Sequence, residues 1–418
     1  MSWRETTIDE LVHIKHGFAF KGDQFNDHGP FVVLTPGNCQ NGGGFKDKGE
    51  KEKRYSGEVP DGYLLKSGDL MVVMTDLVGN APVLGGSFII PEDGKFLHNQ
   101  RLGLVTLKRD AEASSRFVYY LFNTETYRGQ VRGSASGATV RHTSPGRIGA
   151  CKVHIPDLST QERIASLLSA YDDLIENNRR RIALLEQAAR LLYREWFVHF
   201  RFPGHEAVKI VDGLPEGWSI RLLADLCVEG DGIQTGPFGS QLHQSDYTDT
   251  GVPVVMPKDM KENKVDCDVI ARIPESLADK LGRHRMLLGD TVYGRRGDIG
   301  RRAFIGKRQT GFFCGTGCLR IRPDPEKINA RYLFETLGSP ATSGFIVNQA
   351  KGSTMPNLSA GALKKVPVLC APDALQVQFT DLTEPMLETA EILGEQIIRL
   401  IRARDLLLPR LMDGRIPV

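Results

Sequence analysis

Two kinds of hydrophobic pattern alternate along this chain of 418 residues. Two stretches rich in glycine, proline and short β-branched runs contain GPFVVLTPGN and LMVVMT in the first and GVPVVMPKD and GCLRIRP in the second. Such runs predict short strands separated by turns. Each stretch is followed by about 35 residues in which apolar side chains recur at the spacing of an α-helix. The pattern therefore predicts the order strand-rich domain, long helix, strand-rich domain, long helix.

The first helical stretch carries side chains every seven residues along two lines. The first line consists of Ile164, Tyr171, Asn178, Leu185 and Leu192, and the second of Leu168, Ile175, Ile182, Ala189 and Trp196. Alternating spacings of three and four predict the contact seam of a coiled coil. A matching line in the second helical stretch consists of Phe379, Met386, Leu393, Leu400 and Leu407. Asn178 is a polar member of the kind that sets the register of paired helices at some cost in stability.

A simpler alternative is that each helix packs only on its own domain. Helices of about 35 residues span roughly 50 Å, however, which exceeds what a small domain needs. Their polar faces are dense in charge, as in ENNRRR and RLIRARD, which also favours helices that leave their domain and pair. We expect the first helix to begin at a capping box formed by Ser159 and Glu162. We also expect Pro385 to kink or restart the second helix.

The two strand-rich stretches are copies of one another. GATVRHTS at 137–144 matches GSTMPNLS at 352–359, and the same offset in residue number takes Trp3 to Trp218. We call this the repeat offset. Gly68-Asp69 matches Gly289-Asp290 at a slightly larger separation, and loops of unequal length explain this drift. A repeat of this length produces two large domains rather than a solenoid.

We therefore predict an α+β fold of two homologous mixed α/β domains separated by two long antiparallel coiled-coil helices. The predicted segments are domain one at 1–156, the first spacer helix at 157–204, domain two at 205–372 and the second spacer helix at 373–418. The second helix must run back toward domain one to bury its apolar line against the first, which relates the two halves by an approximate two-fold axis. Duplex DNA has a matching local two-fold, with half-sites about 34–36 Å apart in successive major grooves.

Charge narrows the search for a DNA surface to local regions. The whole chain has 53 basic and 51 acidic side chains, so it has no strong overall field. The stretch from Arg283 to Arg322 contains ten basic residues against two acidic ones. Within it, GRRGDIGRR alternates arginine pairs with glycines, which suits close approach to phosphates. The matching stretch of domain one, TDLVGNAPV, lacks these arginines, so the copies share a scaffold and differ in the residues that would recognise DNA.

Candidate DNA-contacting residues come from three places in the sequence, together with Arg132 and Lys351, which precede the closing motifs. The amide and guanidinium groups of FLHNQRLG suit adenine and guanine edges, and the closing motifs and the arginine-rich stretch supply the rest. Any single member can equally be a solvated loop residue. The set is His98, Asn99, Gln100, Arg101, Arg132, Thr139, Arg141 and His142 in domain one, and Arg283, Arg285, Arg295, Arg296, Arg301, Arg302, Lys351, Ser353, Thr354 and Asn357 in domain two.

Composition argues against several other classes of protein. The seven cysteines are scattered and odd in number, which indicates reduced thiols rather than a disulfide framework. Cys314 and Cys318 lack a second pair at zinc spacing, so no metal site is expected. The start, MSWRETTIDELVHIKHGF, has no signal-peptide core, and no run of eighteen apolar residues occurs. We expect a soluble, cytoplasmic protein without a membrane partner.

The motifs, in their order and duplication, resemble the DNA-specificity (S) subunit of type I restriction-modification enzymes over essentially the whole chain. They are LPEGW at 214–218, the two closing motifs, IPDLSTQERIASLL before the first helix, YREWFVHFRFPG after it and LLLPRLMDGRIPV at the end. One departure is APDALQVQF, which leads into the second helix without the capping residues of the first copy.

The resemblance implies that each domain recognises one half of a split DNA target and that the helices set the gap between the halves. It implies as partners double-stranded DNA, two methyltransferase subunits docked on the helices, and motor-nuclease subunits where the host supplies them. Adenine-N6 methylation with S-adenosylmethionine, and cleavage with ATP and Mg, would belong to those subunits, so no cofactor is expected on this chain. Adenine must leave the base stack to be methylated, so opening of the duplex is expected.

Two rival functions are weighed against this one. The first rival is an enzyme in its own right, a methyltransferase or a nuclease. An adenine methyltransferase would carry an Asn/Asp-Pro-Pro-aromatic motif, and the chain has neither this motif nor a Walker A motif. The second rival is a coiled-coil scaffold that presents two protein- or ligand-binding domains without binding DNA. The arginine-rich stretch counts against that rival without excluding it.

Overall fold

The computed structural model describes residues 3–239, 241–297, 299–350 and 357–418, and these fall into two compact units. Unit 1 contains Met1–Arg180 and Leu393–Val418, and unit 2 contains Arg181–Ile392. The boundary between the units cuts both long helices. Each unit therefore consists of an α/β globule and a length of both helices, whereas the sequence analysis divided the chain into four consecutive segments.

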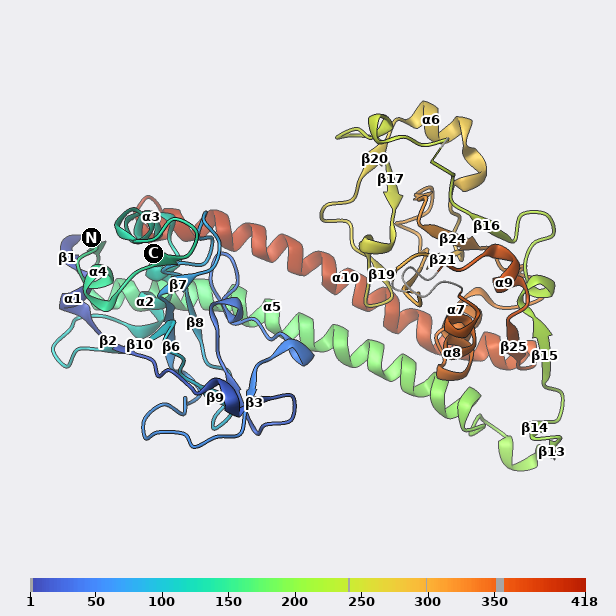
Figure 1. Ribbon diagram of the computed structural model, residues 1–418, viewed down its shortest axis with the longest axis horizontal. Coiled ribbons are helices and arrows are strands. Elements are labelled where there is room, and N and C mark those ends of the chain that lie inside the picture. Colours follow the sequence, from blue (N-terminus) through green and yellow to red (C-terminus); the bar gives the residue numbers. More distant parts are fainter. Residues whose placement is uncertain (1–2, 240, 298, 351–356) are drawn as a thin grey trace. The chain divides into compact units, whose positions relative to one another are not determined.

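The globule of unit 1 is built from short strands and short helices (Figure 1). Its strands are β1 (Arg4–Thr7), β2 (Val12–His16), β3 (Phe25–Asn26), β4 (Phe31–Val33), β5 (Arg54–Tyr55), β6 (Leu70–Val73), β7 (Thr75–Asp76), β8 (Ser87–Ile89), β9 (Phe96–Leu97), β10 (Leu102–Leu107), β11 (Arg141–His142) and β12 (Lys152–Ile155). Its helices are α1 (Ile8–Leu11), α2 (Ser115–Phe122), α3 (Glu125–Ser134) and α4 (Pro145–Gly149), with 3₁₀ turns η1 (Gly22–Gln24), η2 (Pro36–Asn38) and η3 (Gly49–Lys51).

The main sheet of unit 1 has the strand order β2-β10-β6-β8, and all its pairs are antiparallel. Strand β6 is buried along its whole length. Leu70 and Val72 contribute to one hydrophobic cluster and Met71 and Val73 to another. Because alternate side chains of a strand point to opposite faces, apolar cores cover both faces of this sheet. This explains why the sequence LMVV is uniformly apolar.

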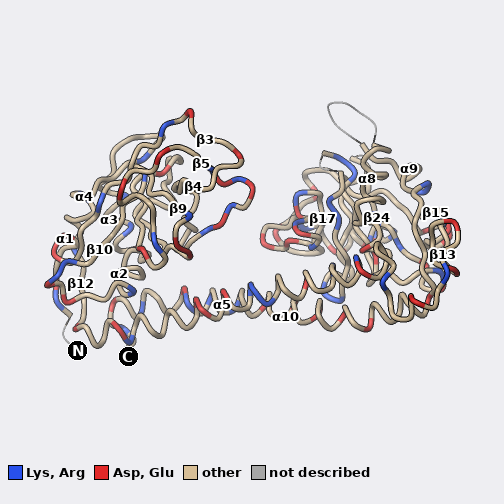
Figure 2. The backbone as a smooth tube through the Cα atoms, turned by 90° about the horizontal axis from the view of Figure 1, so that it is seen from below, with Lys and Arg blue, Asp and Glu red and all other residues tan. Residues whose placement is uncertain are grey.

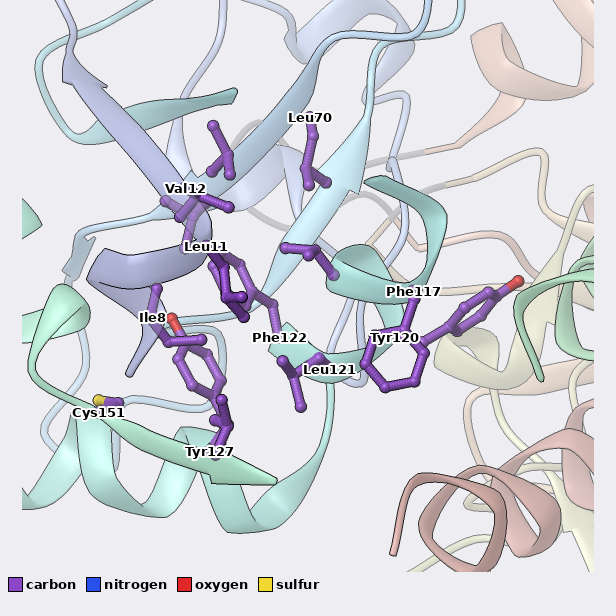
Figure 3. Close-up of a cluster of buried hydrophobic side chains, with 14 of the residues drawn as sticks. Ile8, Leu11, Val12, Leu70, Phe117, Tyr120, Leu121, Phe122, Tyr127 and Cys151 are labelled. Carbon is purple, nitrogen blue, oxygen red and sulfur yellow. The ribbon is translucent and has the colours of Figure 1, made fainter. Parts of the chain in front are cut away.

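A second sheet has the order β3-β5-β4-β9 and contains one parallel pair, β4 with β9. The larger core of unit 1 lies between the main sheet and helices α1, α2 and α3, and Figure 3 shows Ile8, Leu11, Phe117, Phe122 and Tyr127 within it. Residues from both long helices complete this core, so they are part of the hydrophobic interior of unit 1. They are Ile164, Ala165 and Leu168 from the first helix and Leu411 and Met412 from the second.

Unit 2 has its own set of strands and short helices. Its strands are β13 (Ile210–Val211), β14 (Leu214–Pro215), β15 (Ser219–Leu222), β16 (Ile233–Thr235), β17 (Val252–Val255), β18 (Met260–Lys261), β19 (Lys264–Val265), β20 (Arg272–Ile273), β21 (Thr291–Gly294), β22 (Arg302–Phe304), β23 (Phe313–Cys314), β24 (Cys318–Ile321) and β25 (Pro367–Cys370). Its helices are α6 (Glu275–Lys280), α7 (Ala330–Leu337), α8 (Pro340–Gln349) and α9 (Ala360–Lys364), with 3₁₀ turns η5 (His205–Ala207), η6 (Leu223–Leu226), η7 (Gln244–Asp246), η8 (Pro257–Asp259) and η9 (Gly282–His284).

Unit 2 repeats the topology of unit 1. Its main sheet, β16-β24-β21-β22, corresponds to β2-β10-β6-β8, and its parallel pair β17 with β23 corresponds to β4 with β9. Elements β15, α7, α8, α9 and β25 begin and end exactly one repeat offset after β1, α2, α3, α4 and β12. The predicted α+β class and internal repeat are confirmed.

The two long helices are α5 (Leu158–Tyr193) and α10 (Asp373–Met412), and α5 continues into one π-helical turn, η4 (Arg194–Val198). The predicted capping box is wrong, because Ser159 and Glu162 both lie inside α5. The cap is Asp157, whose carboxylate accepts the backbone N–H of Thr160 at 3.0 Å and its hydroxyl at 2.9 Å. Aspartate is as good an N-cap as serine, and here it precedes the serine in the chain.

A buried glutamine ties the start of each long helix to its globule. Gln161 accepts the backbone N–H of Ser114 at 3.0 Å, just before α2. Gln376, the equivalent residue one repeat offset later, accepts the backbone N–H of Asn329 at 3.0 Å, just before α7. The two globules therefore make the same connection to the helices that leave them.

Helix α10 runs through Pro385 without interruption, so the predicted restart is wrong. Proline removes one backbone hydrogen bond from a helix, but Pro385 lies on the exposed face. One turn later in the helix, the Thr389 hydroxyl donates a hydrogen bond to the Pro385 carbonyl at 2.7 Å. Burial of neighbours such as Thr383 holds the helix in place.

The long helices contact each other in both units and run antiparallel. In unit 1, Arg404 contacts Asp172 at 2.7 Å and Gln396 contacts Asn178 at 3.3 Å. Residue numbers therefore increase along α5 while those of their partners decrease along α10. In unit 2, the rings of Tyr193 and Phe379 lie 5.9 Å apart. These contacts exclude the alternative in which each helix packs only on its own domain.

The structure places none of the predicted seam residues on the exposed face of its helix. The buried ones are Ile164, Leu168, Ile175, Asn178, Ala189, Trp196, Phe379 and Leu393. The partly buried ones are Tyr171, Ile182, Leu185, Leu192, Met386, Leu400 and Leu407.

Among the described residues, no helix combines the length and the apolar character needed to span a bilayer.

Candidate nucleic-acid interface

The closing motif of each globule pairs with the loop that follows the central strand of the main sheet. In unit 1, β11 pairs with β7, with Arg141 opposite Asp76 and His142 opposite Thr75. In unit 2, the equivalent pairing is an antiparallel bridge between Arg296 and Asn357. Candidates from distant parts of the sequence are thus brought together at the same place in both units.

The side chains at this pairing differ in exposure. His142 and Thr139 are exposed, and the Thr75 hydroxyl lies 3.1 Å from Nδ1 of His142. Arg141 is half-buried and donates to the backbone carbonyl of Arg132 at 2.7 Å. Arg132 itself pairs with Glu125. The exposed polar side chains here are therefore those of Thr139 and His142, while Thr75 is buried.

The candidates from FLHNQRLG do not form a common surface. His98 is 0% exposed and its Nε2 lies 2.9 Å from the Leu102 carbonyl, so it is a core residue and not a surface one. Burial lowers the pKa of His98 to about 4, so the ring is neutral at pH 7. The Asn99 carboxamide accepts the backbone N–H of Arg101 at 3.0 Å, which leaves Gln100 as the exposed member.

Half of the ten basic residues between Arg283 and Arg322 form ion pairs with carboxylates of unit 2. Arg320 is 1% exposed and donates to the Asp231 carbonyl at 2.8 Å. Arg322 donates to both carboxylate oxygens of Asp290, at 2.9 and 2.8 Å. Arg285 pairs with Glu275 and Asp279, both outside the counted stretch. Figure 2 shows acidic positions interspersed with basic ones in this unit. The positive charge at the surface of this stretch is therefore smaller than the count of basic residues suggests.

The remaining arginine candidates divide into buried and exposed ones. Arg302 stacks on the ring of Phe334 at 4.8 Å and donates to its carbonyl at 3.3 Å. Arg295 is buried and donates to Asn357 at 3.4 Å. The exposed ones are Arg283, Arg296 and Arg301. Candidates Lys351, Ser353 and Thr354 lie outside the described residues.

The sequence analysis missed a groove on unit 1, which we call the Asn41–Leu77 groove. It has a volume of about 690 Å³ and is lined by Gly37, Gln40, Asn41, Lys46, Leu77 and Val83, among others. It borders β7, and Leu77 directly follows the residue that pairs with Arg141. The sequence signal for it was the run QNGGGF, because consecutive glycines mark a backbone with positive φ angles.

Comparison with known proteins identifies the family. Residues 1–187 match the model of the type I restriction modification DNA specificity domain. The domain match and the similar curated proteins indicate a DNA sequence-specificity subunit of a type I restriction-modification system. Specificity subunits select DNA by sequence and are not catalytic, because catalysis in type I systems is carried by partner subunits. These similarities do not favour the alternative function, a coiled-coil scaffold that does not bind DNA.

Curated specificity subunits and a solved one align with most of the chain. It is 25% identical over 311 residues to the type I restriction enzyme MjaIX specificity subunit of Methanocaldococcus jannaschii, covering 73% of this chain and 69% of that one. It is 23% identical over 380 residues to the EcoBI specificity subunit of Escherichia coli, covering 87% and 74%. The crystal structure of an S subunit from M. genitalium matches with a TM-score of 0.62 at 15% identity, covering 99% and 96%, which shows a common fold.

The long helices of this specificity subunit also keep large apolar side chains exposed at equivalent positions. Leu167 of α5 and Leu382 of α10 are separated by the repeat offset, as are Leu191 of α5 and Leu406 of α10. Unit 1 carries Leu167 and Leu406, and unit 2 carries Leu382 and Leu191. Each unit therefore presents the same pair of exposed leucines on its helices.

Proposed function

We propose that each globule of this specificity subunit recognises one half of a bipartite DNA target. The observation that carries the proposal is the pairing of the closing motif with the loop after the central strand, which recurs in both units with different side chains. Thr75 and His142 occupy positions in unit 1 that Arg296 and Asn357 occupy in unit 2. A common scaffold with unlike contacting groups suits recognition of two unlike half-sites.

The long helices set the distance between the two half-sites. Helix α5 has 36 residues and α10 has 40, and they contact each other in both units. Each added turn of both helices lengthens them by about 5.4 Å, which corresponds to between one and two base pairs. Lengthening both by one turn should therefore widen the gap without changing either half-site.

The exposed leucines of the helices are docking positions for two methyltransferase subunits. Their recurrence in both units favours two equivalent partners, because equal surfaces bind equal subunits. In the assembled complex, S-adenosylmethionine belongs to these partners, and ATP and Mg belong to motor-nuclease subunits where these are present. The setting is the cytoplasm, where cellular DNA is accessible.

A domain exchange tests the modular recognition. Residues 1–156 are replaced by those of another family member, and methylated sites are mapped in genomic DNA from cells that also contain the methyltransferase partner. One half-site should change while the other half and the gap stay the same. A change in both halves, or in neither, would contradict the proposal.

Salt dependence separates DNA binding from a scaffold role. Affinity for a duplex containing the mapped target should fall steeply and log-linearly with salt concentration, because bound phosphates release counterions.

Leu167→Glu and Leu382→Glu should each remove one methyltransferase equivalent by native mass spectrometry, with Leu64→Glu as an exposed control away from the helices. A complex that keeps both equivalents in these variants would contradict the docking assignment.

A further inference from the structure

The Asn41–Leu77 groove has two walls whose backbones are held rigidly. On one side, Asn41 precedes three glycines with φ angles of +95°, +97° and +99°. A Cβ on Gly43 would overlap the side chain of Asn123, so only glycine fits there. Backbone bonds from Gly43 to Gln40 at 3.0 Å and from Gln40 to Gly44 at 2.9 Å close the loop. Asn41 is thus presented on a fixed, exposed tip.

Leu77, which lines the groove, and its neighbour Val78 present hydrocarbon to solvent. Leu77 and Val78 are 52% and 48% exposed, although both are large apolar side chains. Buried Asp76 fixes their loop by accepting the backbone N–H groups of Val78 at 3.2 Å and Val83 at 2.8 Å. A buried carboxylate that organises a loop ending in exposed apolar residues indicates a contact surface rather than a folding requirement.

The chemistry of the two walls matches one base pair. A carboxamide forms two hydrogen bonds with N6 and N7 of adenine, and apolar side chains pack on the thymine methyl group in the major groove. Exposed Lys46 at the rim suits a phosphate. Building on the proposed function, we propose that this groove contacts an A·T pair in the half-site recognised by unit 1. Asn41 bonds the adenine edge, and Leu77 packs on the thymine methyl group.

Unit 2 carries different chemistry at the corresponding place. Turn η8 corresponds to η2, and Arg301 donates to the carbonyl of Pro257 there at 3.4 Å. The β18–β19 hairpin stands where unit 1 has its glycine loop, and its tip carries Glu262 and Asn263 instead of Asn41 and three glycines. The proposed A·T contact therefore concerns the groove of unit 1, where Asn41 lies beside exposed Leu77.

The test uses the full chain in complex with its methyltransferase partner and a duplex carrying the mapped target. Each thymine is replaced singly by uracil, which removes the methyl group, and each adenine by 7-deazaadenine, which removes N7. At one A·T pair of the unit 1 half-site, uracil should weaken binding about fourfold, the value of one buried methyl group. Removal of N7 at the same pair should weaken it about fivefold or more.

Variants of the chain assign those penalties to side chains. In Leu77→Ala the uracil penalty should disappear, and in Leu77→Met it should remain. In Asn41→Ala the 7-deazaadenine penalty should disappear. Leu107→Ala, which changes an exposed leucine outside the groove, should keep both penalties.

Three results overturn the inference: a unit 1 half-site without an A·T pair, penalties that survive in Leu77→Ala and Asn41→Ala, or loss of methyltransferase binding in these variants with unchanged penalties. The last result would show that the groove contacts the methyltransferase subunit instead of DNA. The exchange of residues 1–156 is independent of the groove. A changed half-site there, together with failure here, would leave the proposed function intact.

Discussion

The same turn carries an aspartate in both units, but only unit 2 surrounds it with arginines. Asp69 and Asp290 each accept a backbone N–H from three residues upstream, at 2.8 Å from Lys66 and 2.7 Å from Leu287. Asp290 is in addition 1% exposed and bound by Arg322. The repeated backbone thus places an aspartate at the same position in both units. The residues around that aspartate decide whether its carboxylate is exposed to water.

The units also differ in how their globules are attached to the long helices. In unit 1, Asp172 of α5 accepts the hydroxyl of Tyr120 at 2.7 Å and the guanidinium of Arg404 of α10 at 2.7 Å. These three positions correspond to Leu387, Glu335 and Ala189 in unit 2, so this link is absent there. Unit 2 uses ion pairs instead, namely Arg331 with Glu384, Lys264 with Glu186, Lys307 with Glu388 and Arg308 with Glu391.

The largest effect is expected at the buried carboxylate of unit 2. Asp290→Ala leaves Arg320 and Arg322 with Asp231 as their remaining carboxylate partner and should lower the stability of unit 2 by about 3 kcal/mol, the lower end of the cost of breaking a buried ion pair. Asp69→Ala removes only a turn hydrogen bond and should cost about 1 kcal/mol in unit 1. Urea unfolding combined with peptide-resolved hydrogen exchange assigns each loss to its unit. Equal losses in the two variants would remove the distinction between the units.

Acid should destabilise both units through one buried histidine each. Burial lowers the pKa of His98 and of His284 from 6.5 to about 4, with Arg283 adding to the effect at His284. Between these pH values the unfolded chain binds more protons than the folded one. Stability is therefore fully present above pH 6.5 and falls as pH is lowered toward 4, by roughly 2 kcal/mol per histidine at pH 5.

Urea unfolding at pH 7 and pH 5 measures this loss. His98→Gln should remove the pH dependence of unit 1 and leave that of unit 2. A pH-independent unfolding midpoint in the unsubstituted chain would refute the assignment.

The link between the globule and the helices of unit 1 should be worth more than its counterpart in unit 2. Asp172→Ala removes hydrogen bonds to Tyr120 and Arg404 and should cost about 2 kcal/mol, because the groups are only partly exposed. Lys307→Ala breaks an exposed ion pair and should leave the unfolding midpoint unchanged within error. A loss for Lys307→Ala as large as that for Asp172→Ala would contradict the comparison.

The smallest effect is expected at the polar residue of the helix seam. Asn178 is 1% exposed, and its carboxamide oxygen has no partner among the residues that the structure describes. Asn178→Leu introduces the residue type found at the equivalent position of α10, Leu393, and should raise stability by about 1 kcal/mol. Register should become less specific, which mapping of methylated sites would detect as mixed gap lengths. A destabilised variant would show that the amide hydrogen bond outweighs its desolvation.

The elements predicted most accurately are those specified by local pattern. The heptad positions from Ile164 to Leu192 all lie on the inner face of α5, since a helix has a fixed period. The closing motifs are placed equivalently because duplicated segments fold alike. The cap was misplaced because Asp157 and Ser159 are equally good candidates by residue type.

The chemical environment of single side chains could not be predicted in the same way. Arg320 and Arg322 counted as surface charge until Asp231, far upstream in the chain, was found beside them. Leu77 and Asn41 attracted no attention because their groove forms between loops that are distant in the chain.

The sequence by itself determined the repeat, the order of globules and helices and the face of each helix that is buried, because these depend on periodicities of two and 3.6 residues that neighbours along the chain reveal. The tertiary structure alone decided which charges are neutralised, which histidines are buried and where a groove opens. Those properties depend on distances between residues that are far apart in the chain, and no local pattern encodes them.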